Sequence, residues 1–199
     1  MSWNADLSEI IGSLDMSKRP SDSFESLATF VNNDNEAHAS ERKSFKRTFE
    51  TALSEAADSA TPFATRLLVR KFEKQFVRNA TGEETLRLNS TARQALFALL
   101  NHPQSQALLP TLHIYAALHA LIRWNKGHQL RPNDFHDFHH ACAALGYCDV
   151  FLTENTLKSH LTSTHLQLDK FYDGKVAATA DEAVKAVDEL RHRRETGRK

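Results

Sequence analysis

The chain has 199 residues, of which 41% are hydrophobic. This length suffices for one substantial core, and the composition is that of a folded chain instead of a disordered one. Lys+Arg and Asp+Glu number 25 each, so binding to nucleic acid would have to come from local basic patches. No apolar run reaches the roughly 18 residues that a membrane span requires, and the start lacks the pattern of a secretory signal. The two cysteines predict reduced thiols in a cytoplasmic protein.

Residues 1–108 are predicted to form a helical N-terminal region. The polar segment NNDNE (32–36) is expected to break the first helix, and Ser59 to Thr61 to end the second. Pro62 fits the first position of a new helix, where its missing N–H costs nothing. The segment NATGEE (79–84) is predicted to be a loop, with Ser90 capping the next helix.

The helix predicted after Pro62 carries a basic stripe. Its four cations recur at intervals of four residues and therefore share one face: Arg66, Arg70, Lys74 and Arg78. Such a stripe suits the phosphate backbone of single-stranded RNA, and a solvated helix face partly neutralised by Glu73 is the alternative.

Residues 109–199 are predicted to alternate helices with short strands. A helix opens at Pro110 and ends at Gly127, and a second runs from Asp134 to Leu145 with Asn133 as its N-cap. The apolar runs 150–153 and 175–179 are expected to be buried parallel strands. A capping box of Thr179 and Glu182 opens the last helix. We therefore predict a mainly α fold with a small parallel β element.

The final helix is predicted to carry one apolar side, and the tail beyond Arg191 to fray. The residues expected on that side are Ala183, Val184, Val187 and Leu190.

Four carboxylates bracket the first predicted strand. Asp134 and Asp137 lie three residues apart on the first turn of a helix. Asp149 precedes the strand and Glu154 follows it. Oxygen ligands gathered at a strand end suit Mg²⁺ or Mn²⁺, whose bound water can attack a phosphodiester. The alternative is that these residues cap a helix and a strand, as acidic residues near helix N-termini commonly do.

The segment PNDFHDFHHACAALGYCDVFLTEN (132–155) resembles the C-terminal motif region of the PIN-like nucleases, a superfamily of metal-dependent ribonucleases. The residues that match in order are Asn133, Asp134, Asp137, Tyr147, Cys148, Asp149 and Thr153. Glu154 stands where the family pattern has Asp, and the resemblance extends from about Leu109 to Leu190.

This resemblance implies an α/β PIN-like portion after the helical region. It also implies Mg²⁺ or Mn²⁺ held by Asp137 and Asp149, with support from Asp134 or Glu154. PIN-like domains begin with a strand that ends in a metal-binding Asp, and no such strand is found before Leu109. The chain is therefore expected to be either a truncated relative or one that has lost the strand and, with it, catalysis.

The histidines and cysteines of this segment have other interpretations. His136 and His140 are spaced like helical metal ligands, but no Glu of the zinc-protease pattern lies between them, so exposed or hydrogen-bonded histidines are favoured. Cys142 is predicted to be a core residue, and Cys148 has no specific base for a nucleophilic role.

Two hypotheses of different classes follow. In the first, the chain is a metal-dependent endoribonuclease in which Asp134, Asp137, Asp149 and Glu154 are catalytic. In the second, it is a non-catalytic helical interaction module that keeps a PIN-like scaffold. A partner protein or a second copy is a candidate to complete the sheet. A DNA-binding role is weaker, because no helix-turn-helix with a basic recognition helix is found.

Overall fold

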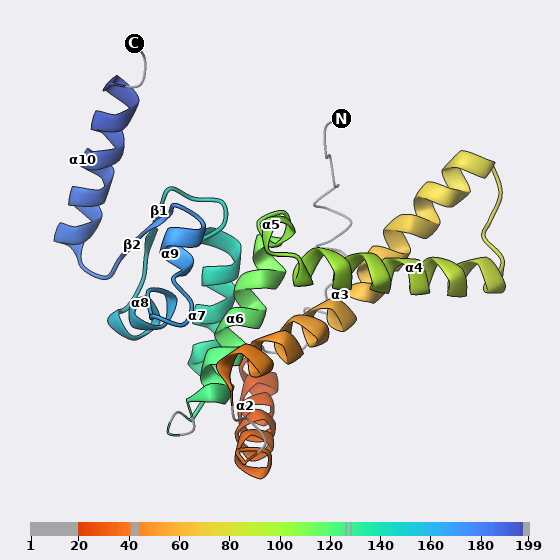
Figure 1. Cartoon of the computed structure of the whole chain (residues 1–199), viewed down its shortest axis with the longest axis horizontal. Helices are drawn as coiled ribbons and strands as arrows, with labels where there is room; N and C mark the ends of the chain where they lie inside the picture. The colour runs from red at the N-terminus through yellow and green to blue at the C-terminus, as the bar shows by residue number, and fades with distance from the viewer. Residues whose placement is uncertain (1–19, 41–43, 126, 128, 197–199) are drawn as a thin grey trace.

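A computed structural model describes residues 20–40, 44–125, 127 and 129–196, except the side chains of residues 20–23 and 27. No strand ending in Asp was expected before Leu109, and residues 1–19 of that stretch lie outside the described part. The fold is mainly helical with a two-stranded parallel sheet near the C-terminus, so the predicted fold class is confirmed (Figure 1). The elements are α2 (Pro20–Ala37), α3 (Phe45–Phe76), α4 (Gly82–Asn101), α5 (Pro103–Gln106), α6 (Pro110–Trp124), α7 (Pro132–Ala144), β1 (Val150–Leu152), α8 (Asn155–Leu161), α9 (Leu168–Phe171), β2 (Lys175–Ala177) and α10 (Ala180–Thr196).

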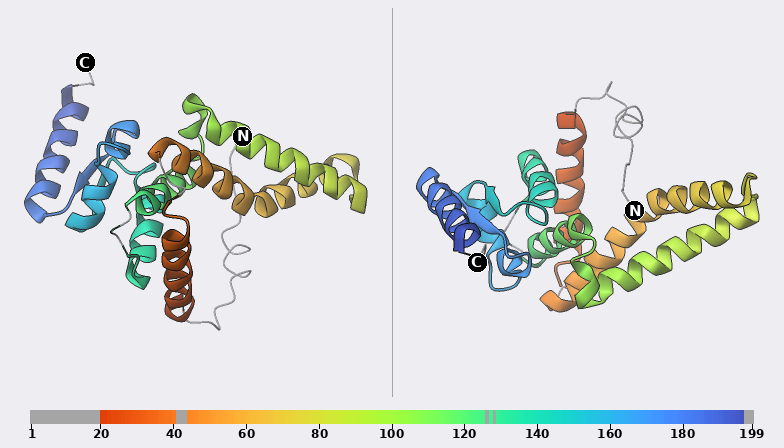
Figure 2. Two further views of the ribbon diagram at one scale, coloured as in Figure 1. Left: turned by 60° about the horizontal axis from the view of Figure 1, so that its bottom comes forward. Right: turned by 90° about the horizontal axis from the view of Figure 1, so that it is seen from above.

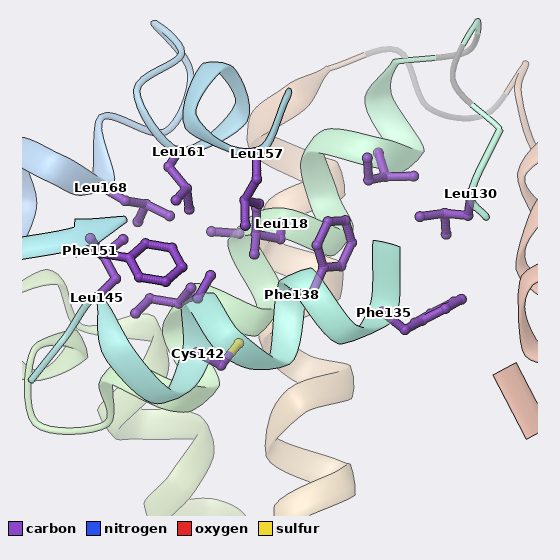
Figure 3. Packing of buried hydrophobic residues seen from close by; sticks show 14 of the residues in the cluster. Leu118, Leu130, Phe135, Phe138, Cys142, Leu145, Phe151, Leu157, Leu161 and Leu168 are labelled. Atoms are coloured by element: carbon purple, nitrogen blue, oxygen red, sulfur yellow. The ribbon is translucent and has the colours of Figure 1, made fainter. Parts of the chain in front are cut away.

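Helix α6 lies at the centre and is buried on nearly every side. Its large residues, Ile114 and Leu118, join a core formed with α2, α7, β1 and α8 (Figure 3). Its small residues, Ala116 and Ala120, join a second core formed with α3 and α4. A helix that is apolar all round is stable only when buried in this way.

Helices α3 and α4 form an antiparallel hairpin whose inner part packs on α6 and whose outer part projects from the molecule (Figures 1 and 2). The predicted break at Ser59 to Thr61 is wrong, because α3 continues through Pro62 for 32 residues. A proline inside a helix removes one backbone hydrogen bond. Packing against α4 and α6 keeps α3 continuous despite this loss, since Ala56, Ala57 and Thr61 are buried there.

Helix α4 begins earlier than predicted, at Gly82 instead of after Ser90. Thr81 and Glu84 form a capping box. The Glu84 N–H donates to Thr81 Oγ1 (3.2 Å), and the Thr81 N–H donates to Glu84 Oε2 (2.9 Å). This reciprocal pair satisfies two backbone donors and extends the helix into the predicted loop.

Three other predicted boundaries differ from the structure. Helix α2 continues through the NNDNE segment to Ala37, and α6 ends at Trp124 instead of Gly127. Helix α7 begins at Pro132, with Arg131 in place of Asn133 as its N-cap. Within the described residues, no helix is long and apolar enough to cross a bilayer.

The C-terminal elements form a small α/β unit. Strands β1 and β2 pair in parallel with Phe151 opposite Val176, as the two apolar runs predicted. Phe151 points into the core beside Leu145 and Leu168 (Figure 3). Helix α10 packs on the opposite face of the sheet, where the Lys175 ammonium lies 3.4 Å from the Glu189 carboxylate.

Gly146 links this unit to the start of α6. A Cβ atom at Gly146 would lie 2.3 Å from Pro110 Cβ, on a rigid ring that cannot turn aside. Gly146 is therefore required by the close approach of two elements.

We expect Gly146→Ala to lower the free energy of unfolding by about 1–3 kcal/mol, the usual cost of inserting a methyl group into a packed site. Urea denaturation followed by circular dichroism measures this change. Gly82→Ala is the matched control, since a Cβ there would meet nothing within 4 Å. Equal stability of the two variants would contradict the packing argument.

Candidate functional site

Asp134 caps the N-terminus of α7. Its Oδ2 accepts a hydrogen bond from the Arg131 N–H at 2.8 Å. Asp137, one turn later, accepts a longer hydrogen bond of 3.4 Å from the Asn133 amide. Both carboxylates therefore bond to groups of their own helix start, an arrangement that the helix dipole favours.

Asp149 and Glu154 lie at opposite ends of β1. The Arg194 guanidinium of α10 donates to Asp149 Oδ2 at 2.7 Å. Glu154 is exposed and is the N-cap of α8. Strand β1 has three residues, and the five residue steps from Asp149 to Glu154 put the two Cα atoms up to about 16 Å apart at roughly 3.3 Å per extended residue. Ligands of one Mg²⁺ lie about 2.1 Å from it, so we do not expect these two side chains to share a single ion.

No cluster of three or more His, Cys, Asp or Glu side chains suited to a metal ion occurs in the described ranges. The structure places Asp134 and Asp137 together on one helical turn, and it separates Asp149 from Glu154 by the length of β1.

The histidines of α7 are exposed, and two of them, His136 and His139, contact α2. The His136 ring meets the Phe24 ring edge to face at 4.8 Å, and the His139 ring lies 5.7 Å from the same ring. Partial burial and the neighbouring His136 and His140 lower the pKa of His139. The His136 and His139 rings therefore pack against an aromatic side chain of α2.

The two cysteines differ in environment. Cys142 is buried in the core, as predicted, and burial raises the pKa of its thiol to about 12. Cys148 is exposed beside the N-terminal end of β1. A thiol with so high a pKa stays protonated and is a poor nucleophile, so Cys142 serves the core.

The basic stripe lies on the exposed side of α3. Arg66, Arg70 and Lys74 are all exposed. Arg78 instead turns toward the start of α4, where its guanidinium donates to both Glu84 oxygens at 2.8 and 2.6 Å. This pairing, with the backbone bonds of the capping box, lowers the pKa of Glu84 to about 2.

Phe63 and Leu67 are also exposed on the side of α3 that carries the stripe, and the sequence patterns did not single them out. Each follows by two residues a buried threonine, Thr61 or Thr65, and Thr65 Oγ1 accepts a hydrogen bond from the Asn89 amide of α4 at 3.1 Å. Two residues correspond to about 200° around a helix, so Phe63 and Leu67 point away from α4. We call Phe63, Arg66, Leu67, Arg70 and Lys74 the arm face.

The sequence patterns also did not single out two buried histidines on α6, His113 and His119. A pattern based on apolar residues gives no signal for a single polar residue on a buried helix face. His113 Nδ1 lies 2.7 Å from the Tyr172 hydroxyl. His119 Nε2 has no hydrogen-bond partner within the described residues. Burial lowers the pKa of each to about 4, with Arg123 and His139 adding to the effect at His119. Both rings are therefore neutral at pH 7.

We expect the free energy of unfolding to fall as the pH drops from 6.5 toward 4. A histidine with a pKa near 6.5 when unfolded and about 4 when folded binds its proton first in the unfolded chain. Each histidine should therefore cost about 2 kcal/mol of stability at pH 5 relative to pH 7. Urea denaturation at several pH values measures the slope.

His119→Phe should remove about half of this pH dependence, whereas His102→Gln, at an exposed position, should leave it unchanged. The same slope in His119→Phe and the wild type would refute the assignment.

Comparisons of the chain with protein-family models, with curated proteins and with solved structures found no match. The resemblance to PIN-like nucleases therefore stays a prediction that rests on the residues from Asn133 to Glu154. Two surfaces of the molecule combine exposed apolar side chains with charged ones. The first is the arm face, and the second is formed by β1 and α10, with Leu152, Val184 and Val187 exposed.

Proposed function

We propose that this chain is a helical interaction module that binds single-stranded RNA through the arm face. One observation carries the proposal: three exposed cations and two exposed apolar side chains share the side of α3 that α4 does not cover. The hairpin that displays them projects from the molecule (Figure 1), so a long strand can approach it from the open side.

The charge of the arm face supports a polyanionic ligand. The segment 65–78 carries five cations and one carboxylate, although the whole chain is balanced. That carboxylate, Glu73, is half-buried and accepts a hydrogen bond from the Ala80 N–H at 3.2 Å. Its charge is thus directed to the loop between α3 and α4, and the exposed side of α3 stays basic.

The spacing of the arm face supports a single strand as the ligand. Side chains four residues apart lie about 5–6 Å from each other along a helix, so Arg66, Arg70 and Lys74 form a row that can follow successive phosphates. Phe63 offers a ring on which an unpaired base can stack. Base stacking requires unstacked nucleotides, which favours single-stranded RNA over a duplex.

We expect the triple variant Arg66→Ala, Arg70→Ala, Lys74→Ala to bind RNA at least tenfold more weakly than the wild type. The probe is a fluorescein-labelled single-stranded RNA of about 20 nucleotides, longer than the site of a typical single-strand-binding fold. Fluorescence anisotropy gives the affinity at several salt concentrations. Losing three phosphate contacts should reduce the slope of log K against log salt by about 2.

The matched control removes the same net charge from exposed positions elsewhere, with Lys46→Ala, Arg47→Ala and Lys185→Ala. This control should bind RNA nearly as well as the wild type. Equal weakening in both triple variants would show general charge attraction instead of a site, and no binding by the wild type would end the proposal.

The same RNA tests the predicted metal-dependent ribonuclease, which is favoured by the pattern from Asn133 to Glu154. The separation of Asp149 from Glu154 leads us to expect intact RNA after incubation with Mg²⁺ or Mn²⁺, as judged by denaturing gels. Fragments produced by the wild type and absent with Asp137→Asn would instead establish the nuclease. Asp188→Asn, at an exposed position on α10, is the control for a nonspecific loss of charge.

A further inference from the structure

The sheet is small for its type. In the described part of the chain it has two parallel strands of three residues each. Parallel strands usually lie within larger sheets, and a two-stranded sheet alone is only marginally stable. Helices cover both faces of this sheet, but the outer edge of β1 has no further strand among the described residues.

The outer edge of β1 presents backbone groups that can pair. The Lys175 N–H donates to the Asp149 carbonyl (2.9 Å), and the Thr153 N–H donates to the Ala177 carbonyl (2.8 Å). Alternate residues of β1 therefore face β2, and the N–H and C=O groups of Val150 and Leu152 point outward.

An apolar surface lies beside this edge. Val150 and Leu152 project on the face that α10 covers, and Leu152 is 57% exposed. Val184 and Val187 of α10 are 62% and 50% exposed. Ala186 makes the buried contact of α10.

A groove of about 300 Å³ runs between β1 and α10. Val150, Val187 and Leu190 form its apolar side. Asp149 and Arg194, which pair with each other, lie at its charged end. Exposed apolar side chains along a strand with a free edge are typical of a site for another strand.

The charges along this surface are self-complementary. Helix α10 has an exposed Asp181 in its first turn, and Arg191 near its other end lines the groove. A second α10 lying antiparallel to the first would place Asp181 of each copy beside Arg191 of the other, with the helix dipoles opposed. Glu182, Arg193 and Arg194 already pair within the chain, with Lys158, Asp173 and Asp149. A foreign strand would need to supply this charge pattern, whereas a second copy of the chain already has it.

We propose that two copies of this chain pair through β1 about a two-fold axis perpendicular to the sheet. Val150 of each copy lies opposite Leu152 of the other, which is the register that uses the outward groups of both strands. The result is one four-stranded sheet with antiparallel pairing at its centre. Closed two-fold dimers are the commonest protein assemblies.

The dimensions of this dimer agree with helix packing. In the four-stranded sheet, the midpoint of the β1–β2 pair of one copy lies two strand spacings, about 10 Å, from the midpoint of the same pair in the other copy. Packed helices lie about 8–10 Å apart, so two α10 helices above the sheet come into contact. This contact covers Leu152, Val184 and Val187 of both copies.

Sedimentation equilibrium with protein at up to about 100 μM tests the dimer, since micromolar association is visible there. The wild type should approach twice the chain mass of 22.5 kDa. Leu152→Pro removes an outward N–H without touching the β1–β2 hydrogen bonds, as proline is tolerated on edge strands. Both Leu152→Pro and Val187→Glu should raise the dissociation constant at least tenfold.

Leu108→Glu is the matched control, because Leu108 is 69% exposed but lies on α5's side of the molecule, away from β1. This variant should dimerise like the wild type. Circular dichroism verifies that each variant is folded, and Val187→Glu, on the surface of α10, keeps the test valid where Leu152→Pro unfolds. A monomeric wild type, or a folded Val187→Glu that dimerises normally, would overturn the proposal whatever the result with RNA.

Discussion

The structure depends on the burial of α6. Ten of its fifteen residues are buried, and the two core clusters meet on it. Its alanine side allows α3 and α4 to approach closely, while Ile114 and Leu118 fill the core under α7 and β1. Burying one leucine or isoleucine contributes about 1.5–3 kcal/mol, so this helix organises both the hairpin and the α/β unit. The same burial excludes water from His113 and His119, which makes the core sensitive to acid.

The sequence predicted those elements whose local signals agree with their tertiary environment. The two strands, 150–152 and 175–177, fall within the predicted short runs 150–153 and 175–179, which occur between helices. The break at Pro62 was wrongly predicted because the local penalty of proline is smaller than the packing energy along α3. The start of α4 was misplaced because Ser90 and Thr81 are both good caps, and the reciprocal bond to Glu84 decided between them.

The candidate site shows a different limit. Acidic residues are favoured both at helix N-termini and as metal ligands, so the spacing of Asp134 and Asp137 cannot distinguish a cap from a ligand. Whether such side chains gather around one point depends on the fold, and no group of three or more His, Cys, Asp or Glu side chains suited to a metal ion occurs in the described residues. In the same way, apolar spacing placed Val184 and Val187 on one side of the last helix, and only the folded chain shows that they are 62% and 50% exposed.

The two proposed surfaces lie at opposite ends of the molecule, with the hairpin on one side and α10 on the other (Figure 1). Pairing through β1 would therefore leave both arm faces open, and a dimer would present two of them on one rigid core. When one RNA strand spans both arms, the second contact becomes intramolecular and its effective concentration can reach millimolar values. A module whose single arm offers three cations would then bind a long strand far more tightly than a short one. Dimerisation thus gives a balanced chain, with only a local basic patch, a physical route to useful affinity for a polyanion.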